Sequence, residues 1–396
     1  MRRTRSTLSA RVVAVGGVVL AAGLPFTGAA SAATTHYHQQ LEISGPTGSA
    51  FGYAVAIDGQ TRAVEEPYAN GGDGAVEIYT GAPAHWTHQA ELTAPDAGTN
   101  VHGFGEVLAF VSDNTLAVGA PYHNGYMGAI YIFTGSGSSW TLQDEITDPL
   151  NTAFDYFGAS LGVEDHGILT GGAESAGGAV YALAGSGSTW TVQQTIVPAD
   201  RGAADAFGFS LAVDGSKLVV GSPQHGGGGA IYFYSESKEN WTQRGEFQDP
   251  GTSATDALGT SVAIDDSTAV AGAPSSDYSQ VGTAYVYRQS DNAWAMKATL
   301  HPSDGVTGDA FGWPVAIDGS TILAASSNHN GGAGVAYVFT KGHGDKWSQA
   351  QELAPSDPQP GAFFGWPTLT FDGSDILISA PYTTGGTLYW FSPQEH

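Results

Sequence analysis

Cysteine is absent from the sequence of 396 residues. Its absence excludes disulfide bonds, a thiol nucleophile and cysteine-ligated zinc. A chain of this length can nevertheless bury enough apolar surface to fold without covalent cross-links. We therefore expect a domain that is stabilised by its hydrophobic core alone.

Positive charge is also scarce. The chain has 13 Lys and Arg residues against 38 Asp and Glu residues, and its formal net charge is −25. Because nucleic acids and anionic membranes are bound mainly through Lys and Arg, this balance excludes a nucleic-acid partner and argues against a membrane surface. Charged residues make up 13% of the chain, about half the usual share.

Long hydrophobic runs are missing except near the start of the chain. Four arginines among the first eleven residues precede an apolar run at residues 12–24, which is too short to span a bilayer, and Ala30-Ser31-Ala32 follows as a small-residue cleavage site. This pattern predicts a secretory signal peptide at residues 1–32 and a secreted mature protein at residues 33–396. Cleavage there leaves nine basic and 38 acidic residues, a net charge of −29.

Linear catalytic motifs are missing as well. The sequence has no Gly-x-Ser-x-Gly, no His-Glu-x-x-His and no phosphate-binding loop, and its candidate general bases are scattered. We therefore expect a protein that is not an enzyme. A hydrolase or lyase site at a fold axis stays open as an alternative, because a fold can bring distant residues together.

A repeat of 50 to 53 residues organises the rest of the chain. Each copy contains short apolar runs bounded by Gly, Pro, Asp, Asn or Ser, and a full copy has four of them, which is typical of four antiparallel strands. The seven copies begin at Phe51, Phe104, Phe157, Phe207, Leu258, Phe311 and Phe364.

This period predicts an all-β fold, a seven-bladed β-propeller of four-stranded antiparallel blades. The last copy lacks a fourth strand, whereas the segment from Tyr37 to Ile43 precedes the first copy and resembles the other fourth strands. We expect this N-terminal strand to complete the last blade and close the ring. Tryptophans that recur in the fourth strands are expected to pack between blades. These are Trp86, Trp140, Trp190, Trp241, Trp294 and Trp347.

The repeat resembles the FG-GAP repeat of the integrin α-chain propeller and of many secreted bacterial proteins. Each copy has Phe-Gly or Leu-Gly, four then have a motif such as Gly119-Ala120-Pro121 or Gly272-Ala273-Pro274, and three have Gly-Ala-x-Tyr, as at Gly128-Ala129-Ile130-Tyr131. Integrin-type repeats often bind calcium in the first hairpin of a blade, but the corresponding hairpins of this chain are too short. Three copies depart from the Gly-Ala-Pro pattern: Glu65-Glu66-Pro67, Gly171-Gly172-Ala173 and Ala325-Ser326-Ser327.

The chain also resembles secreted, cysteine-free actinobacterial propellers that carry glutamines near the N-terminus. That resemblance implies a regulatory protein that engages an extracellular partner, induces autolysis of a neutral metalloprotease (a dispase) and is a glutamine-donor substrate of transglutaminase. Gln39 and Gln40, beside the mature N-terminus, are the first candidates for cross-linking. The second candidates lie in outer strands and are Gln193, Gln194, Gln349 and Gln351.

Aspartates in the loops that lead into the first strands suggest an acidic face and a weak calcium site. The candidates are Asp200, Asp205, Asp304 and Asp309; solvated turns are the favoured alternative. No cofactor is otherwise predicted. His123, His225 and His329 occupy equivalent loops, but their blades are too far apart for one zinc ion to bind all three.

Aromatic residues follow the Phe-Gly pair in several copies. Tyr53, Trp313 and Trp366 belong to copies that are neighbours in a closed ring, so we expect an aromatic patch near the axis. Such a patch suits a protein partner or, in the alternative function of a carbohydrate-binding lectin, a sugar ring. Packing between blades is the competing interpretation.

Overall fold

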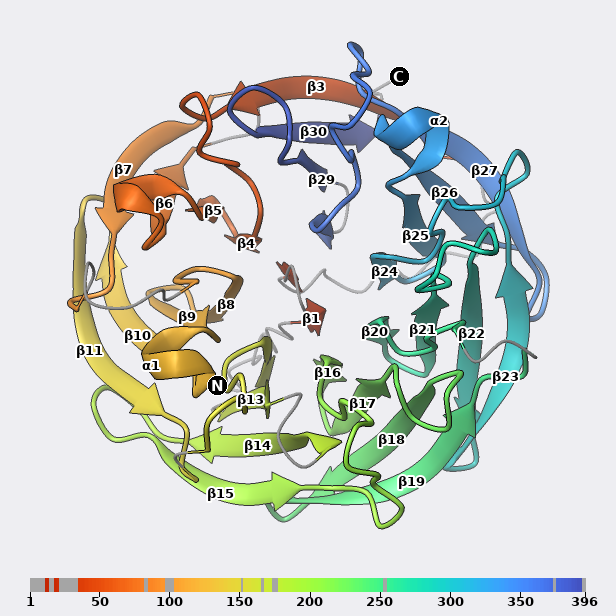
Figure 1. The fold of residues 1–396 in the computed structure, drawn as a ribbon, viewed down its shortest axis with the longest axis horizontal. Coiled ribbons are helices and arrows are strands. Elements are labelled where there is room, and N and C mark those ends of the chain that lie inside the picture. Colours follow the sequence, from red (N-terminus) through yellow and green to blue (C-terminus); the bar gives the residue numbers. More distant parts are fainter. Residues whose placement is uncertain are drawn as a thin grey trace, which may run out of the picture.

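Seven sheets stand around one central axis in the computed structural model of the chain (Figure 1). The structure describes residues 11–13, 18–20, 35–81, 85–96, 103–150, 152–164, 167–172, 177–251, 255–372 and 375–393. Within these residues, consecutive strands of each blade pair antiparallel and step outward from the axis. The prediction of a seven-bladed, all-β propeller with four-stranded blades is confirmed.

The blades contain the following strands, each blade taken from the axis outward. They are β4 (Val55–Asp58), β5 (Thr61–Glu66), β6 (Ala75–Thr80) and β7 (Thr87–Leu92) in blade 1; β8 (Val107–Ser112), β9 (Thr115–Ala120), β10 (Ala129–Ser136) and β11 (Ser139–Thr147) in blade 2; β12 (Ser160–Glu164), β13 (Gly167–Gly172), β14 (Ala179–Ala184) and β15 (Thr191–Ile196) in blade 3; β16 (Ser210–Asp214), β17 (Lys217–Ser222), β18 (Ala230–Ser237) and β19 (Asn240–Gln248) in blade 4; β20 (Ser261–Asp265), β21 (Thr268–Ala273), β22 (Thr283–Ser290) and β23 (Ala293–Leu300) in blade 5; β24 (Val315–Asp318), β25 (Thr321–Ser326), β26 (Val335–Lys341) and β27 (Trp347–Leu353) in blade 6; and β28 (Leu369–Asp372), β29 (Asp375–Ala380), β30 (Thr387–Pro393) and β3 (Tyr37–Ser44) in blade 7.

The ring closes through the N-terminal strand. β3 pairs antiparallel with β30, and Ser44 lies opposite Thr387. The hydroxyl of Thr368 in blade 7 also donates a 2.7 Å hydrogen bond to the carbonyl of Tyr53 in blade 1. Because both ends of the propeller share one sheet, neither apolar end face is left open, as the sequence predicts.

Glycines allow neighbouring blades to approach each other. Gly128 has a φ of 89°, and a Cβ built there would lie 2.0 Å from the carbonyl oxygen of Phe157 in the next blade. A parallel β-bridge joins these two residues. Only glycine fits such a position, so the glycine of the Gly-Ala-x-Tyr motif is explained by contact between blades.

Aromatic side chains fill the layers between the blades. Phe104 is fully buried, and its ring centroid lies 5.4 Å from that of Tyr131 in the same blade. Trp294 of blade 5 stacks on Phe233 of blade 4 with the centroids 4.1 Å apart. The other fourth-strand tryptophans also pack on or within core clusters that join two or more blades, which confirms their predicted role.

Two short strands extend the first sheet towards the axis. β1 (Arg11–Val13) pairs with β2 (Val18–Leu20), which pairs in parallel with β4; Figure 1 shows β1 near the centre of the ring. The rest of the predicted signal peptide, residues 1–32, lies outside the described residues. Within the described part of the chain, no helix combines the length and the apolar character needed to cross a bilayer.

Candidate functional site

One face of the ring carries the loops between the second and third strands together with the loops between blades. We call it the loop face. Three helical turns lie on it: η1 (Ala69–Gly71), α1 (His123–Tyr126) and α2 (His329–Gly332). Tyr126, at the end of α1, stacks on Phe154 of the following inter-blade loop at 5.6 Å. The two kinds of loop therefore share a face, as the strand pattern predicts.

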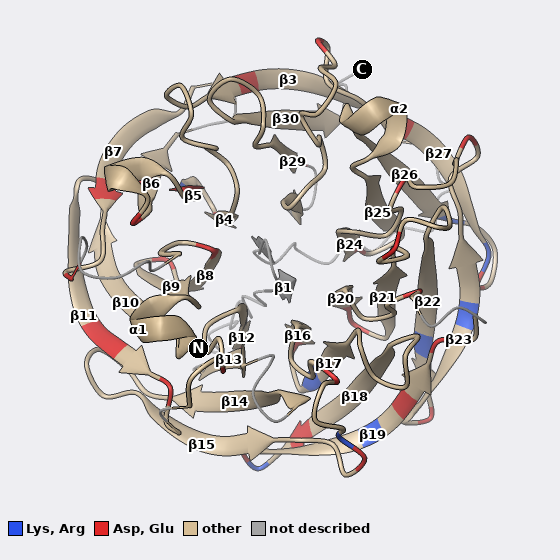
Figure 2. Ribbon diagram, in the orientation of Figure 1, with Lys and Arg blue, Asp and Glu red and all other residues tan. Residues whose placement is uncertain are grey.

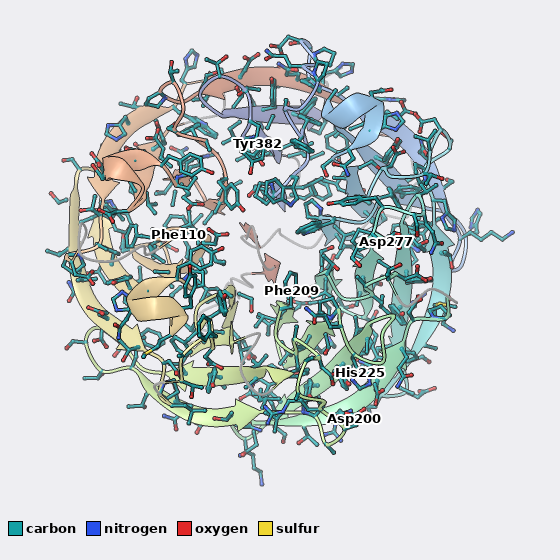
Figure 3. All side chains as sticks on the ribbon, viewed as in Figure 1. Phe110, Asp200, Phe209, His225, Asp277 and Tyr382 are labelled. Atoms are coloured by element: carbon teal, nitrogen blue, oxygen red, sulfur yellow. The ribbon has the colours of Figure 1, made fainter. Side chains whose placement is uncertain are left out.

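The residue that follows each Phe-Gly pair, or the equivalent Leu-Gly, leads into the innermost strand of its blade and borders the axis on the loop face. Figure 3 shows Phe209, one of these residues, beside the axis. Repetition of the motif thus places one side chain of each blade around the mouth of the axis. The seven residues are Tyr53, Glu106, Ala159, Phe209, Thr260, Trp313 and Trp366.

Four aromatic residues form a continuous arc at this mouth. The ring of Trp366 lies 5.9 Å from that of Trp313 and 5.3 Å from that of Tyr53, both edge to face, and it stacks on Tyr382 at 5.9 Å. We call these four residues the aromatic arc. The sequence predicts the meeting of Tyr53, Trp313 and Trp366 but misses Tyr382, which is 47% exposed. The sequence signal for Tyr382 was its position directly after Pro381, the proline of the Gly-Ala-Pro-type motif of blade 7.

A cavity of about 450 Å³ adjoins the arc between blades 4, 5 and 6. Trp313 forms part of its wall. The indole Nε1 atoms of Trp313 and Trp366 are buried and have no hydrogen-bond partner among the described residues. The other lining residues are Phe209, Pro223, Gln224, Gly227, Ala257, Thr260, Pro274, Ser275, Ser276, Tyr278 and Ala310.

Two buried glutamates stand on the opposite side of the arc. Glu106 is 7% exposed and accepts a 3.3 Å hydrogen bond from the hydroxyl of Tyr122. Glu65 is fully buried, and neither of its carboxylate oxygens has a partner in the described structure. Glu65 occupies the position at which Gly119 of blade 2 approaches blade 3, so its side chain lies between blades 1 and 2.

Burial governs the protonation of this pair. Burial raises the pKa of Glu106 to about 7, although hydrogen bonds from Tyr122 and Tyr53 counteract the rise. Burial and the adjacent charge of Glu106 raise the pKa of Glu65 well above its usual value. Two carboxyl groups in one apolar site therefore resist simultaneous ionisation. Sequence reasoning missed the pair; its signal was the departure of Glu65-Glu66-Pro67 from Gly-Ala-Pro.

The predicted calcium-site aspartates bind neighbouring side chains. Nδ1 of His225 lies 2.7 Å from a carboxylate oxygen of Asp205, and Nδ1 of His329 lies 2.9 Å from one of Asp309. The hydroxyl of Tyr337 donates to Asp304 at 2.8 Å. Asp200 likewise accepts a bond from a third-strand tyrosine. Each of these two histidines thus contacts aspartates of the loop that precedes its own blade. The polar neighbours of the four aspartates include histidine nitrogens and tyrosine hydroxyls.

A tyrosine–aspartate bond recurs around the ring and was not anticipated from the sequence. The third-strand tyrosine of blade 2, Tyr131, donates to Asp96 of the preceding inter-blade loop at 3.1 Å. These bonds tie six of the inter-blade loops to the blades that follow them, and blade 1 has Glu77 at the tyrosine position. The recurring Gly-x-x-Tyr pattern was their signal. The other pairs are Tyr181 with Asp155, Tyr232 with Asp200, Tyr285 with Asp249, Tyr337 with Asp304 and Tyr389 with Asp357.

The glutamine candidates fall into two groups. Gln40 and Gln193 are exposed and occupy β-bulges of outer strands. The others are held by hydrogen bonds with neighbouring segments: Gln194 with the backbone of Trp241, Gln351 with that of Tyr37, Gln349 with Ser303 and Gln39 with Ser356. The N-terminal segment is therefore a paired strand rather than a free arm.

Comparison with known protein families agrees with this architecture. The FG-GAP repeat family matches residues 86–133, 190–234, 241–287 and 294–339. Each matched segment begins at an outer-strand tryptophan of one blade and ends in the third strand of the next, so it includes the contact between blades. No curated protein matches the chain. The chain is therefore a seven-bladed β-propeller in which these four segments match the FG-GAP repeat.

Proposed function

We propose that the protein is a secreted, non-enzymatic binding protein that engages another extracellular protein at the mouth of the propeller axis. FG-GAP propellers commonly bind protein partners, and they are typical of extracellular proteins. The aromatic arc is the observation that carries the proposal. It combines partly exposed side chains from blades 6, 7 and 1 on one surface, and aromatic side chains dominate the energetics of protein interfaces.

Tyr382 offers the sharpest test of this surface, because it is 47% exposed and its loss should leave the fold intact. We expect wild-type protein to retain a partner from culture medium and Tyr382→Ala to bind it with a Kd raised about 30-fold, equivalent to about 2 kcal/mol. Met296→Ala is the matched control, since Met296 is 44% exposed on the outer strand β23. Equal binding by all three proteins would refute the proposal.

The proposed partner is a neutral metalloprotease whose autolysis the propeller induces. Support comes from the resemblance to secreted, cysteine-free propellers with that activity. We expect the intact protease to disappear faster when it is incubated with wild-type protein than alone, and Tyr382→Ala to reduce the acceleration. An unchanged rate of autolysis would exclude the metalloprotease as the partner. The pull-down from culture medium would then identify which other extracellular protein binds.

We further propose that transglutaminase uses the bulge glutamines Gln40 and Gln193 as amine acceptors. A β-bulge leaves its extra residue unpaired, and both side chains are exposed. Peptide mapping after labelling with a fluorescent primary amine should find label at these two positions. Gln351, which is bonded to the backbone of Tyr37, is the internal control. Label at Gln351 in place of Gln40 and Gln193 would contradict the proposal.

Carbohydrate binding is the second candidate function. Trp313 favours it, because its ring forms part of the cavity wall and its indole nitrogen has no partner among the described residues; sugars stack on aromatic rings and their hydroxyls accept hydrogen bonds. A glycan array would show binding of a defined sugar if this function holds. Silence across the array would remove it.

A further inference from the structure

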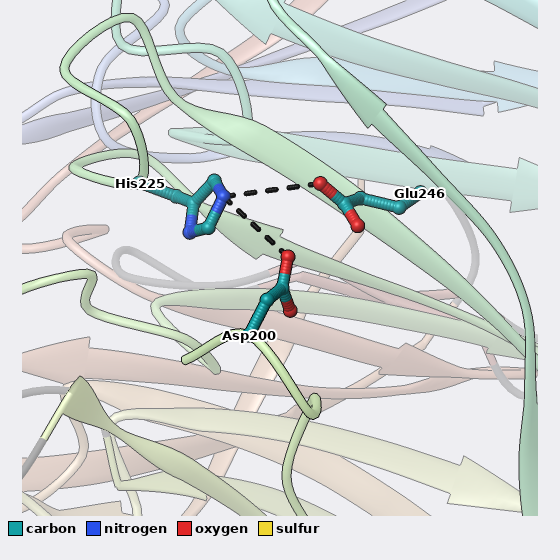
Figure 4. Close-up of side chains that lie close together, drawn as sticks. All are labelled: Asp200, His225 and Glu246. Atoms are coloured by element: carbon teal, nitrogen blue, oxygen red, sulfur yellow. Dashed lines mark ion pairs between the residues drawn. The ribbon is translucent and has the colours of Figure 1, made fainter. Parts of the chain in front are cut away.

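Three side chains of the types that bind metal ions converge at the outer side of blade 4. Asp200 comes from the loop between β15 and β16, His225 from the loop between β17 and β18, and Glu246 from β19. Figure 4 shows the three side chains pointing towards one another. One ligand atom of each residue lies within 4.8 Å of the other two.

The separations suit a shared ion better than direct hydrogen bonds. Nε2 of His225 lies 3.7 Å from an oxygen of Asp200 and 3.8 Å from an oxygen of Glu246, whereas a hydrogen bond to nitrogen spans about 2.7–3.2 Å. Ligands of a tetrahedral zinc ion, at bonds of about 2.1 Å, lie about 3.4 Å apart. The side chains of Asp200 and Glu246 are 42% and 26% exposed, so each has room for that small adjustment.

A further carboxylate orients the imidazole. Nδ1 of His225 lies 2.7 Å from Asp205, and both side chains are almost buried. If Nδ1–H donates to Asp205, the lone pair of Nε2 is left on the side of Asp200 and Glu246, where the amide nitrogen of Gln248 also lies 3.5 Å away. Histidines that bind metal ions usually have such an outer carboxylate, which sets the tautomer and strengthens the ligand.

The equivalent histidine of blade 6 lacks the complete arrangement. His329 has the same outer partner, Asp309 at 2.9 Å, and Nε2 lies 3.3 Å from Asp304. Glu352 occupies the position of Glu246, but no ion pair joins it to His329 among the described residues, and it accepts a 3.2 Å hydrogen bond from the amide of Gln349. Glu246 also accepts an amide hydrogen bond, at 2.9 Å from Gln248, but it lies 3.8 Å from Nε2 of His225.

Blade 2 differs in another way. Asp96 lies 3.6 Å from Nδ1 of His123, while Glu145 lies 3.5 Å from Nε2. The two carboxylates therefore face opposite nitrogens of the ring, and one ion on a single nitrogen cannot bind both. The three equivalent loops thus provide one complete set of ligands and two natural comparisons.

We propose that Asp200, His225 and Glu246 bind one divalent transition-metal ion of the zinc class, with Asp205 as the positioning residue of His225. One imidazole nitrogen and two carboxylate oxygens are ligands that zinc accepts, and three protein ligands leave a fourth position for water. The ion links the inter-blade loop, the second-to-third-strand loop and the outermost strand of blade 4. Gln224 and Gly227, in the same loop as His225, line the cavity between blades 4, 5 and 6, so an ion bound by His225 would stabilise the loop that forms this wall.

Zinc titration of the untagged, chelator-treated protein tests the proposal. Calorimetry should show that one zinc ion binds per chain. Cobalt bound in place of zinc should give the visible absorption bands that are typical of four- or five-coordinate cobalt. His225→Gln and Glu246→Gln should abolish this binding, and Asp205→Asn should weaken it 10- to 100-fold. Glu246 lies partly exposed on an outer strand, so Glu246→Gln keeps the test valid if His225→Gln does not fold.

His329→Gln and His123→Gln are the matched controls and should retain the wild-type stoichiometry. The proposal is overturned if the wild-type protein binds no zinc at a large excess of the ion. It is also overturned if Glu246→Gln binds zinc as the wild type does, or if the control variants lose binding to the same extent. If the site instead binds calcium, if zinc does not displace that calcium and if Glu246→Gln abolishes its binding, then the assignment to a zinc-class ion is wrong and the site is a calcium site.

Discussion

Gly128 illustrates how one residue determines the spacing between blades. A Cβ at this position would lie 2.0 Å from the carbonyl oxygen of Phe157, and the φ of 89° is unfavourable for other residues. We expect Gly128→Ala to lower the free energy of unfolding by about 3 kcal/mol, because a steric clash adds to backbone strain. Urea denaturation measures the change.

Gly187→Ala is the control for backbone strain without a steric clash. Gly187 has a φ of 58°, and a methyl group added to its Cα would meet no neighbouring atom within 4 Å, so this variant should lose only about 1 kcal/mol. Equal losses in the two variants would show that close approach of the blades is not what selects glycine at Gly128.

Glu106 should make stability depend on pH. Its pKa rises from 4.5 to about 7 on burial, so between these values the folded chain holds a proton that the unfolded chain has released. Stability therefore falls as the pH rises from 4.5 to 7 and is constant for this group above that range. The stability gained by Glu106→Gln relative to wild type should be about 3 kcal/mol greater at pH 8 than at pH 4.

Denaturant midpoints of both proteins at the two pH values provide the measurement. The difference between variant and wild type cancels the titrating groups that Glu106 does not affect, and it reports on Glu106 together with its coupled neighbour Glu65. A gain that is the same at pH 4 and pH 8 would show that Glu106 has the same pKa in the folded and the unfolded chain.

Strand β3 is the element on which closure of the ring depends. The hydroxyls of Ser44 and Thr387 lie 3.1 Å apart across the pairing with β30. Because the chain has no cysteine, Ser44→Cys with Thr387→Cys gives a clean test. We expect the double variant to form an intramolecular disulfide on oxidation, detected as a cross-linked peptide by mass spectrometry.

Ser44→Cys with Ser392→Cys is the control, since Ser392 lies opposite His38 rather than Ser44. This pair should retain its free thiols. Cross-linking of the control pair and not of the Ser44–Thr387 pair would place β3 in another register.

The elements could be predicted from the sequence because they repeat. Seven Phe-Gly or Leu-Gly pairs define the blades, and the position after each pair identifies Tyr53, Trp313 and Trp366 as neighbours. Glu65 and Glu106 could not be recognised as a pair, because each replaces a different consensus residue in a different blade. The Asp200, His225 and Glu246 set was also missed, since its members come from three connections that only the folded blade brings together.

At the scale of the whole molecule, charge is distributed unevenly around the ring. Figure 2 shows Lys and Arg mainly on the outer strands of blades 4 to 6, including β19, β22 and β23, whereas Asp and Glu occur all around it. The aromatic arc, in blades 6, 7 and 1, lies largely beside the part with few basic residues. A partner that covers the arc therefore meets a predominantly acidic surround, which favours a basic rim on that partner.

Hydrogen–deuterium exchange of the propeller, with and without the protein that it retains from culture medium, tests the central claim most directly. The account predicts slower exchange in loop-face peptides that contain Tyr53, Trp313, Trp366 and Tyr382. Peptides with the Asp214-Gly215 turn, which lies on the other face, should exchange at the same rate in both states. Protection of that turn, with none at the aromatic arc, would contradict the assignment of the binding site to the mouth of the axis.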